Sequence, residues 1–159
     1  MTNEKKHIVI IGAGFGGITA MQNLARHIPS DFSITLIDKH HHQIYTPALY
    51  EIASMPKEAT EDSMLKSSIL LPIEYMTHKA CVSFLCDEFT GLDATHKTVT
   101  LAHAGTLPYD YLILALGSET AYFDIPGLRE HALPLKTFDD AIRMRNAIED
   151  LLKRKEEVN

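Results

Sequence analysis

A strand, a glycine-rich turn and a helix, predicted in immediate succession near the N-terminus, constrain this chain more than any other stretch. Residues 7–11 are mostly β-branched and apolar, as in a buried parallel strand. The glycines that follow, Gly12, Gly14 and Gly17, have the spacing G-x-G-x-x-G. In this pattern the first glycine permits a tight turn, the second lets a pyrophosphate approach the backbone and the third lets the helix pack on the strand. The stretch therefore predicts an anion site at the helix N-terminus.

A second predicted strand supports a dinucleotide-binding unit. Residues 33–37 are again mostly apolar, and the strand ends on Asp38, about 20 residues after Gly17. An acidic residue at about this distance holds a ribose hydroxyl group in such units. We interpret residues 7–38 as a βαβ unit that binds a dinucleotide, in preference to an ordinary turn with an incidental acidic residue.

Composition excludes several other classes of function. The 159 residues suffice for one domain with a hydrophobic core. A net charge of −6, without a basic cluster, argues against a nucleic-acid-binding surface. The longest apolar run, residues 111–116, is too short to cross a bilayer. The first residues lead directly into a strand that the fold needs, so we predict no removable signal peptide. Two cysteines without an export signal favour a reducing, cytoplasmic compartment.

The predicted elements give an α/β fold. After the βαβ unit we expect a short helix over 47–54, irregular chain over 55–62 and a helix over about 67–76. A strand over 82–89 then opens a β-meander. A buried strand over 109–116 and a helix with Thr137 as its N-cap follow. We therefore predict a Rossmann-type parallel sheet with helices on both faces. A small antiparallel β-meander is inserted near residues 82–107.

Four blocks of sequence, in order along the chain, resemble the type II NADH dehydrogenases. The blocks are residues 12–17, 36–39, 45–53 and 109–118, and the resemblance extends from about residue 6 to about residue 150. Members of this family are single-subunit, FAD-containing NADH:quinone oxidoreductases within the wider superfamily of pyridine nucleotide flavoproteins. The resemblance implies that FAD, not NAD, binds at the glycine-rich turn.

The resemblance also implies a set of FAD-binding residues, while it implies no catalytic residue within this chain. The residues that would lie at the pyrophosphate are those of the turn, Gly12, Ala13, Gly14, Phe15, Gly16 and Gly17. Asp38 and Lys39 would lie at the adenosine ribose, and Val82 would lie at the adenine. Ala115 and Gly117 would belong to a second FAD-contacting motif, and Thr46 with Pro47 would lie towards the flavin ring. From the residues alone, plain strand core would be the preferred interpretation of Val82 and Ala115.

The family pattern continues beyond the stretch that this chain matches. We expect residues 1–159 to be the N-terminal portion of one FAD-binding domain, insufficient by itself for turnover. In the complete enzyme, NADH would give a hydride to FAD and a quinone would then accept the electrons. We expect the complete enzyme to lie peripherally on the cytoplasmic face of the membrane. An open flavin end would expose Ile113, Leu114 and Leu116, and such apolar residues favour self-association.

Two alternatives from the residues stay open. One is another flavin oxidoreductase of the same superfamily, such as a sulfide:quinone or ferredoxin reductase. The other is a nucleotide-binding module without catalytic activity. Flavin absorbance of the purified protein separates the module from both oxidoreductases.

Two further motifs are interpreted as structural. Cys81 and Cys86 have C-x4-C spacing, but on a strand their side chains would point to opposite faces roughly 16 Å apart, too far for a disulfide. The run His40-His41-His42 lies in a loop, where consecutive side chains rarely converge on one ion. We predict neither a dithiol centre nor a metal site.

Overall fold

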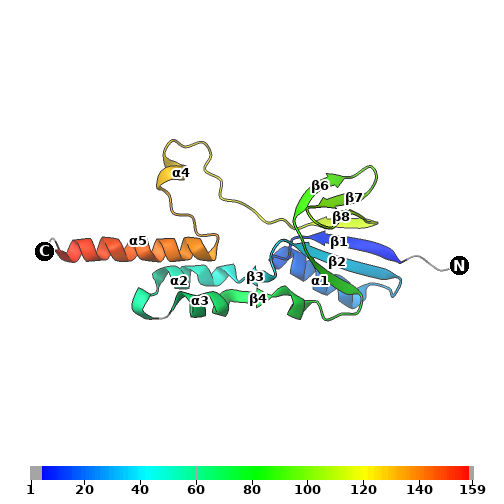
Figure 1. Ribbon diagram of the computed structural model, residues 1–159, viewed down its shortest axis with the longest axis horizontal. Coiled ribbons are helices and arrows are strands. Elements are labelled where there is room, and N and C mark those ends of the chain that lie inside the picture. The colour runs from blue at the N-terminus through cyan, green and yellow to red at the C-terminus, as the bar shows by residue number, and fades with distance from the viewer. Residues whose placement is uncertain (1–4, 60, 158–159) are drawn as a thin grey trace. The chain divides into compact units, whose positions relative to one another are not determined.

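The computed structural model describes residues 5–59 and 61–157, which divide into two compact units (Figure 1). The first unit comprises the chain up to Gln43 together with Pro72–Gly117. The second comprises Ile44–Leu71 together with the chain from Ser118 onward. A two-stranded sheet of β3 (His42–Ile44) and β4 (Leu70–Pro72) lies where the sequence passes from one unit to the other and back.

The first unit is built on a parallel sheet with the strand order β5-β2-β1-β9. Its strands are β1 (Lys6–Ile11), β2 (Phe32–Asp38), β5 (Val82–Cys86) and β9 (Tyr111–Leu114). Helix α1 (Phe15–His27) connects β1 to β2, and both β5 and β9 pair in parallel with their neighbours. The predicted βαβ unit and Rossmann-type sheet are therefore confirmed.

Alternate residues of β1 enter two different cores, because successive side chains of a strand point to opposite faces. Ile8 and Ile10 pack with Met21 of α1, and all three are almost fully buried. On the other face, Val9 and Ile11 join a second buried cluster. Residues 8–11 are therefore shielded from solvent on both faces of the strand, which explains why they form a continuous apolar run.

The second face of the parallel sheet is covered by an antiparallel sheet of β6 (Phe89–Asp93), β7 (Thr98–Leu101) and β8 (Gly105–Pro108). The prediction of helices on both faces is thus wrong for this unit, since Val99 and Leu101 of β7 occupy that side (Figure 1). The meander also begins later than predicted. Residues 82–86 pair in parallel with β2 and belong to the main sheet.

The second unit is helical. Its elements are η1 (Thr46–Ala48), α2 (Leu49–Ser54), η2 (Lys57–Ala59), α3 (Asp62–Ile69), α4 (Leu128–His131) and α5 (Phe138–Glu157). Its core combines buried apolar residues of α2, α3 and α5, among them Leu49, Ile52, Leu65, Ile69, Phe138 and Ala141. The predicted helix over 47–54 is confirmed as η1 followed by α2.

Helix α5 begins where the sequence predicts, at a reciprocal cap. The Asp140 N–H donates to Thr137 Oγ1 over 3.1 Å, and the Thr137 N–H donates to Asp140 Oδ2 over 2.9 Å. This is the geometry of a capping box, with Asp in the position usually taken by Glu. Burial by itself would raise the pKa of the Asp140 carboxyl, but hydrogen bonds from Arg143 and Thr137 outweigh it and lower that pKa.

The helix predicted over 67–76 is two separate elements. Helix α3 ends at Ile69, Leu70–Pro72 is extended, and η3 (Ile73–Met76) follows. Pro72 explains the break, because a proline disfavours helical backbone in the residue before it and cannot donate a helical hydrogen bond.

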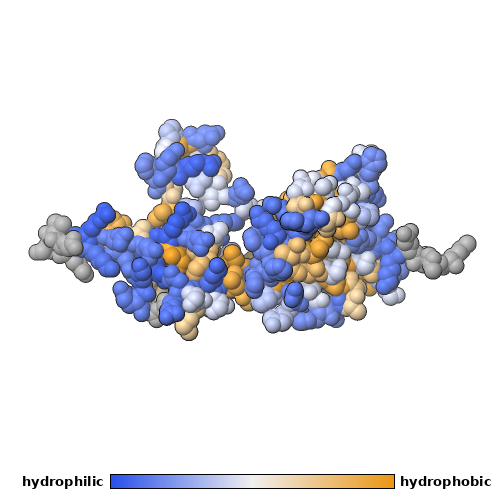
Figure 2. Space-filling view, in the orientation of Figure 1, coloured by the Kyte–Doolittle hydropathy of each residue, from blue (hydrophilic) through white to orange (hydrophobic). Residues whose placement is uncertain are grey.

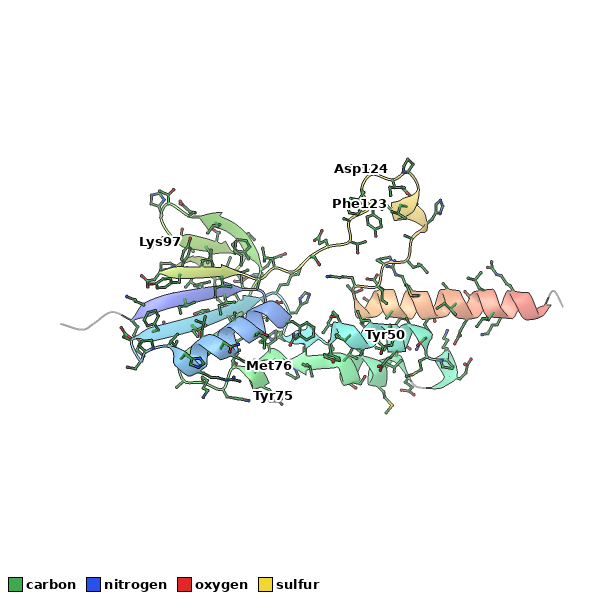
Figure 3. The ribbon with its side chains drawn as sticks, turned by 180° about the vertical axis from the view of Figure 1, so that it is seen from behind. Tyr50, Tyr75, Met76, Lys97, Phe123 and Asp124 are labelled. Carbon is green, nitrogen blue, oxygen red and sulfur yellow. The ribbon has the colours of Figure 1, made fainter. Side chains whose placement is uncertain are left out.

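Several large apolar side chains stay at the surface, visible as orange areas in Figure 2. Leu114 is 51% exposed and Leu116 is 61% exposed, as the sequence predicts, whereas Ile113 packs partly against the core under α1. Phe123 and Asp124 lie in the loop before α4 (Figure 3). Both have positive φ angles. Self-association through the apolar residues stays a prediction.

Candidate functional site

The glycine-rich turn leads the chain from β1 into α1 at the carboxyl end of the parallel sheet. Gly12 has φ = 99°, in the left-handed region, and its N–H donates to the Ile37 carbonyl over 2.7 Å. A Cβ atom on Gly12 would lie 2.2 Å from the Ala115 carbonyl oxygen, and one on Gly17 would lie 1.8 Å from the Gly12 carbonyl oxygen. Since the atoms in the way are backbone, both positions require glycine.

Gly14 differs from these two glycines because nothing in the protein forces a glycine there. It is the N-cap residue of α1, with φ = −72° and ψ = −170°, a conformation that any residue adopts. A Cβ atom on Gly14 would meet no atom within 4 Å. Open space therefore lies beside the backbone at this point of the turn.

The N-terminus of α1 has no capping side chain of its own, although the Asp38 carboxylate binds the Ala13 N–H just before the helix. Gly14 provides no side-chain cap, and the first turn of α1 contains no acidic residue. The first N–H groups of a helix have no acceptor within it. An anion in the open space beside Gly14 would satisfy such donors and the dipole together.

Asp38 ends β2 and faces the turn. Its Oδ2 accepts a hydrogen bond from the Ala13 N–H over 2.7 Å, and its Oδ1 accepts one from the His40 N–H over 2.9 Å. His40 Nδ1 lies 3.2 Å from the same Oδ1. The next residue, Lys39, is exposed and places its Nζ 3.8 Å from Glu88 Oε1. The structure thus brings the predicted carboxylate into contact with the predicted phosphate loop.

The second predicted motif also meets the glycine-rich turn. The Ala115 N–H donates to the Ile11 carbonyl over 2.7 Å, which extends the pairing of β9 with β1. The Ala115 side chain would lie 3.4 Å from a Cβ atom on Gly17. Gly117, two residues later, is exposed and has φ = 77°.

Val82 lies at the opposite end of β5 from the glycine-rich turn. It begins β5 and pairs with Ile34, while Cys86 at the other end of β5 pairs with Asp38. At the rise of a strand, Val82 lies about 13 Å from the carboxyl end of β5, and its contact with the adenine stays a prediction. Thr46 is exposed and belongs to the second unit, so its contact with a flavin stays a prediction.

The carboxyl end of β5 contributes residues that the sequence analysis missed. The Asp87 N–H donates to the Asp38 carbonyl over 3.0 Å, beside the pair Asp38 and Cys86. Burial raises the pKa of the Cys86 thiol, and the carboxylates of Asp38 and Asp87 raise it further. The usable signal was the end of the mostly apolar stretch 82–85, because the carboxyl ends of parallel strands meet at one edge.

The Asp87 carboxylate joins β5 to the turn between β7 and β8. It accepts hydrogen bonds from the N–H groups of Glu88, His103 and Ala104, and His103 Nδ1 lies 2.9 Å from its Oδ1. Burial by itself would raise the pKa of this carboxyl group. The hydrogen bond from the His103 side chain and those from the backbone outweigh burial and lower the pKa to about 2.

Cys81 and Cys86 are both free cysteines. The raised pKa of Cys86 disfavours a thiolate there. Within residues 5–59 and 61–157, no cluster of three or more His, Cys, Asp or Glu side chains is arranged to bind a metal ion. Over the same residues, no helix has the length and apolarity needed to cross a membrane.

Comparison with known proteins assigns the chain to a family. The family model of pyridine nucleotide-disulphide oxidoreductases matches residues 6–155. The chain belongs to this family. Similar members include the type II NADH:quinone oxidoreductase of Staphylococcus haemolyticus, 30% identical over 151 residues, and that of Mycobacterium tuberculosis, 32% identical over 149 residues. These alignments cover 94% and 91% of this chain but 36% and 30% of the relatives, so the chain spans about a third of their length.

Solved structures of pyridine nucleotide-disulphide oxidoreductases share the fold. The sulfide:quinone oxidoreductase of Aquifex aeolicus superposes with a TM-score of 0.76 at 26% identity, over 93% of this chain and 32% of that one. The NDH2 of Plasmodium falciparum superposes with a TM-score of 0.72 at 26% identity, over 96% of this chain and 30% of that one. The resemblance to type II NADH dehydrogenases is therefore confirmed.

Proposed function

We propose that the first unit binds FAD through the adenosine diphosphate half of the cofactor. The pyrophosphate would lie in the open space beside Gly14, against the N-terminus of α1, and Asp38 would hold the adenosine ribose. The observation that carries the proposal is this open space at a helix N-terminus that has no side-chain cap. The backbone there offers N–H donors, and it leaves room for every atom of a phosphate group.

In the complete protein we propose electron transfer from NADH through FAD to a quinone. Support comes from the type II NADH:quinone oxidoreductases that resemble nearly the whole of this chain. Hydride acceptance is chemistry that the flavin supplies when bound, whereas binding and orientation are the task of the protein. We assign that task to the turn of residues 12–17, to Asp38 and Lys39, and to Ala115 and Gly117, and we assign no catalytic residue.

The remaining proposals concern how much of the FAD-binding domain this chain contains and where the complete enzyme lies in the cell. Residues 1–159 would form the N-terminal portion of one FAD-binding domain, with Thr46 and Pro47 towards the flavin ring. The complete enzyme would lie in the cytoplasm, peripheral to the membrane where its quinone dissolves. The share of the relatives' length that this chain covers supports the first proposal.

The substitution Gly14→Ala tests the FAD site. Because a Cβ atom there meets nothing within 4 Å and the backbone is unstrained, the variant should fold like the natural protein. The same Cβ atom would enter the space assigned to the pyrophosphate, so the affinity for FAD should fall by about tenfold or more. Titration of FAD into the protein, followed by flavin fluorescence, measures the affinity, and circular dichroism checks the fold.

Gly91→Ala is the matched control. A Cβ atom on Gly91, in β6, would lie 3.6 Å from the Thr100 side chain, which is ordinary contact. Its FAD affinity should equal that of the natural protein. Equal affinity of the Gly14→Ala variant would reject the proposed cofactor site.

Sulfide oxidation is the second candidate function, favoured by the superposition on the Aquifex aeolicus enzyme. The raised pKa of Cys86 disfavours a role of this thiol as a nucleophile for sulfur transfer. Anaerobic addition of NADH or of sodium sulfide to the FAD-loaded complete enzyme separates the two candidates. Loss of flavin absorbance with sulfide alone would favour this second function.

A further inference from the structure

The Asp38 carboxylate already has three hydrogen-bond donors. The Ala13 N–H binds Oδ2, and the His40 N–H and the His40 ring bind Oδ1. An ionised carboxylate accepts only, so Nδ1 must carry the proton in this last contact. A carboxylate has about four acceptor positions in all, two on each oxygen. One position is therefore left, and it lies on Oδ2.

An adenosine ribose brings two neighbouring hydroxyl groups to the same carboxylate. To bind both, Asp38 must offer one acceptor position on each oxygen. Oδ2 has such a position, but both positions of Oδ1 are taken by His40. Either one ribose hydroxyl stays unbound, or a donor leaves Oδ1.

The His40 ring is the donor that can leave. Its side chain is 67% exposed, whereas that of Asp38 is 20% exposed. The His40 N–H belongs to the backbone that leaves β2, and its position follows from the strand. Rotation of an exposed ring into water costs little, because water replaces the hydrogen bond that is lost.

We propose that the His40 imidazole competes with the adenosine ribose for Asp38 Oδ1 and withdraws when the ribose binds. The inference rests on the proposed function, because it takes Asp38 as the ribose ligand. His40 is here a regulatory residue of the binding site and takes no part in the chemistry of the flavin.

The competition gives the site a dependence on pH. A protonated ring is held at Asp38 by charge as well as by a hydrogen bond, so the ribose displaces it less readily. The affinity for the nucleotide should therefore be lower at a pH low enough to protonate the ring.

Other titratable groups surround the ring and need controls. Its own loop contributes Lys39 and His41, the start of β3 contributes His42, and the end of β5 contributes Cys86, Asp87 and Glu88. The residues of the glycine-rich turn carry no charge. Lys39 and Glu88 pair with each other, and the His41 ring packs edge-on against Phe84. His42, the first residue of β3, is exposed and supplies a matched control two positions from His40.

The experiment measures the dissociation constants of FAD and of ADP at pH 6 and pH 8 by titration calorimetry. ADP carries the same ribose and diphosphate without a flavin. In the natural protein both constants should rise about threefold to fivefold at the lower pH, as expected for an exposed ion pair. His40→Ala should bind at least as tightly as the natural protein at pH 8 and should lose most of the pH dependence. His42→Ala should keep the whole of it.

His40→Gln separates the charge from the hydrogen bond. An amide keeps a donor but cannot be protonated, so this variant should bind at the same strength at both pH values. Weaker binding by His40→Ala at pH 8 would overturn the inference, because the ring would then be helping to hold the ribose. An unchanged pH dependence in His40→Ala would overturn it as well.

The two ligands distinguish this inference from the proposed function. FAD binding without the His40-dependent change with pH rejects the competition and leaves FAD as cofactor. The expected change with ADP, in a protein that does not bind FAD, upholds the competition and rejects FAD. Absence of binding by either ligand overturns both.

Discussion

Asp87 in the first unit and Arg145 in the second are both buried charges, but their partners differ in number and origin. Asp87 is 5% exposed and is bound by backbone N–H groups of three residues and by the His103 ring. Arg145 is 1% exposed, and its Nη2 lies 2.5 Å from Asp62 Oδ1. Its Nε and Nη1 have no hydrogen-bond partner among the residues that the structure describes.

The difference concerns how far each charge depends on a single side chain. Most donors to Asp87 are backbone groups, which remain after any substitution other than one to proline. Arg145 depends on one carboxylate of another helix, and the Asp62 side chain is itself 55% exposed. A buried charge that loses its partner is strongly destabilising, whereas its replacement by an apolar side chain can be neutral. The second unit should therefore be the more sensitive of the two.

Asp62→Ala should give the largest effect. It leaves the Arg145 guanidinium buried and unpaired, which should lower the free energy of unfolding of the second unit by about 3 kcal/mol. Urea unfolding, followed by circular dichroism, measures the change. Glu61→Ala removes a neighbouring exposed carboxylate and should change stability by less than about 0.5 kcal/mol. Equal effects of the two substitutions would show that Asp62 does not compensate Arg145.

Asp87→Asn should have a smaller effect, and one that depends on pH. The folded pKa of Asp87 is about 2, below its ordinary value of 3.8, so ionisation of this group stabilises the fold above about pH 4. That contribution is lost as the pH falls through about 2. Melting temperatures of the natural protein measured from pH 5 to pH 2 should decrease more steeply than those of the variant.

Glu88→Gln is the control for this pH dependence, because Glu88 is the exposed neighbour of Asp87. Its melting temperatures should follow those of the natural protein over the whole range. If the melting temperatures of Asp87→Asn also followed those of the natural protein, the hydrogen bonds at Asp87 would not be the source of the acid sensitivity.

Arg145→Met should give the smallest effect. It removes the charge, keeps much of the apolar stem and leaves no donor without a partner, so stability should stay within about 1 kcal/mol of the natural protein. In the Asp62→Ala background it should restore most of the lost stability. A double-mutant cycle in urea measures this coupling. Additive effects of the two substitutions would contradict the dependence of Arg145 on Asp62.

Features that depend on neighbours in sequence were predictable. The turn with Gly12, Gly14 and Gly17 follows from spacing alone, as does Asp38 at the end of β2. The cap between Thr137 and Asp140 is equally local. Each of these features is set by backbone geometry within a few residues, which the sequence specifies directly.

Features that depend on distant pairing were not predictable in the same way. The strand over 82–86 alternates much like the meander that follows it, and only its pairing with β2 places it in the parallel sheet. That register pairs Val82 with Ile34 and places Cys86 beside Asp38. Arg145 lies 83 positions from its partner, and no local pattern marks a charged residue of an amphipathic helix as buried.

Because α1 covers one face of the parallel sheet and the antiparallel sheet covers the other, residues 8–11 of β1 are buried on both faces. The proposed nucleotide would therefore meet this strand at its carboxyl end, in the turn that follows Ile11. Substitutions in the two cores could then adjust stability without altering the rim of the sheet where the nucleotide is proposed to bind.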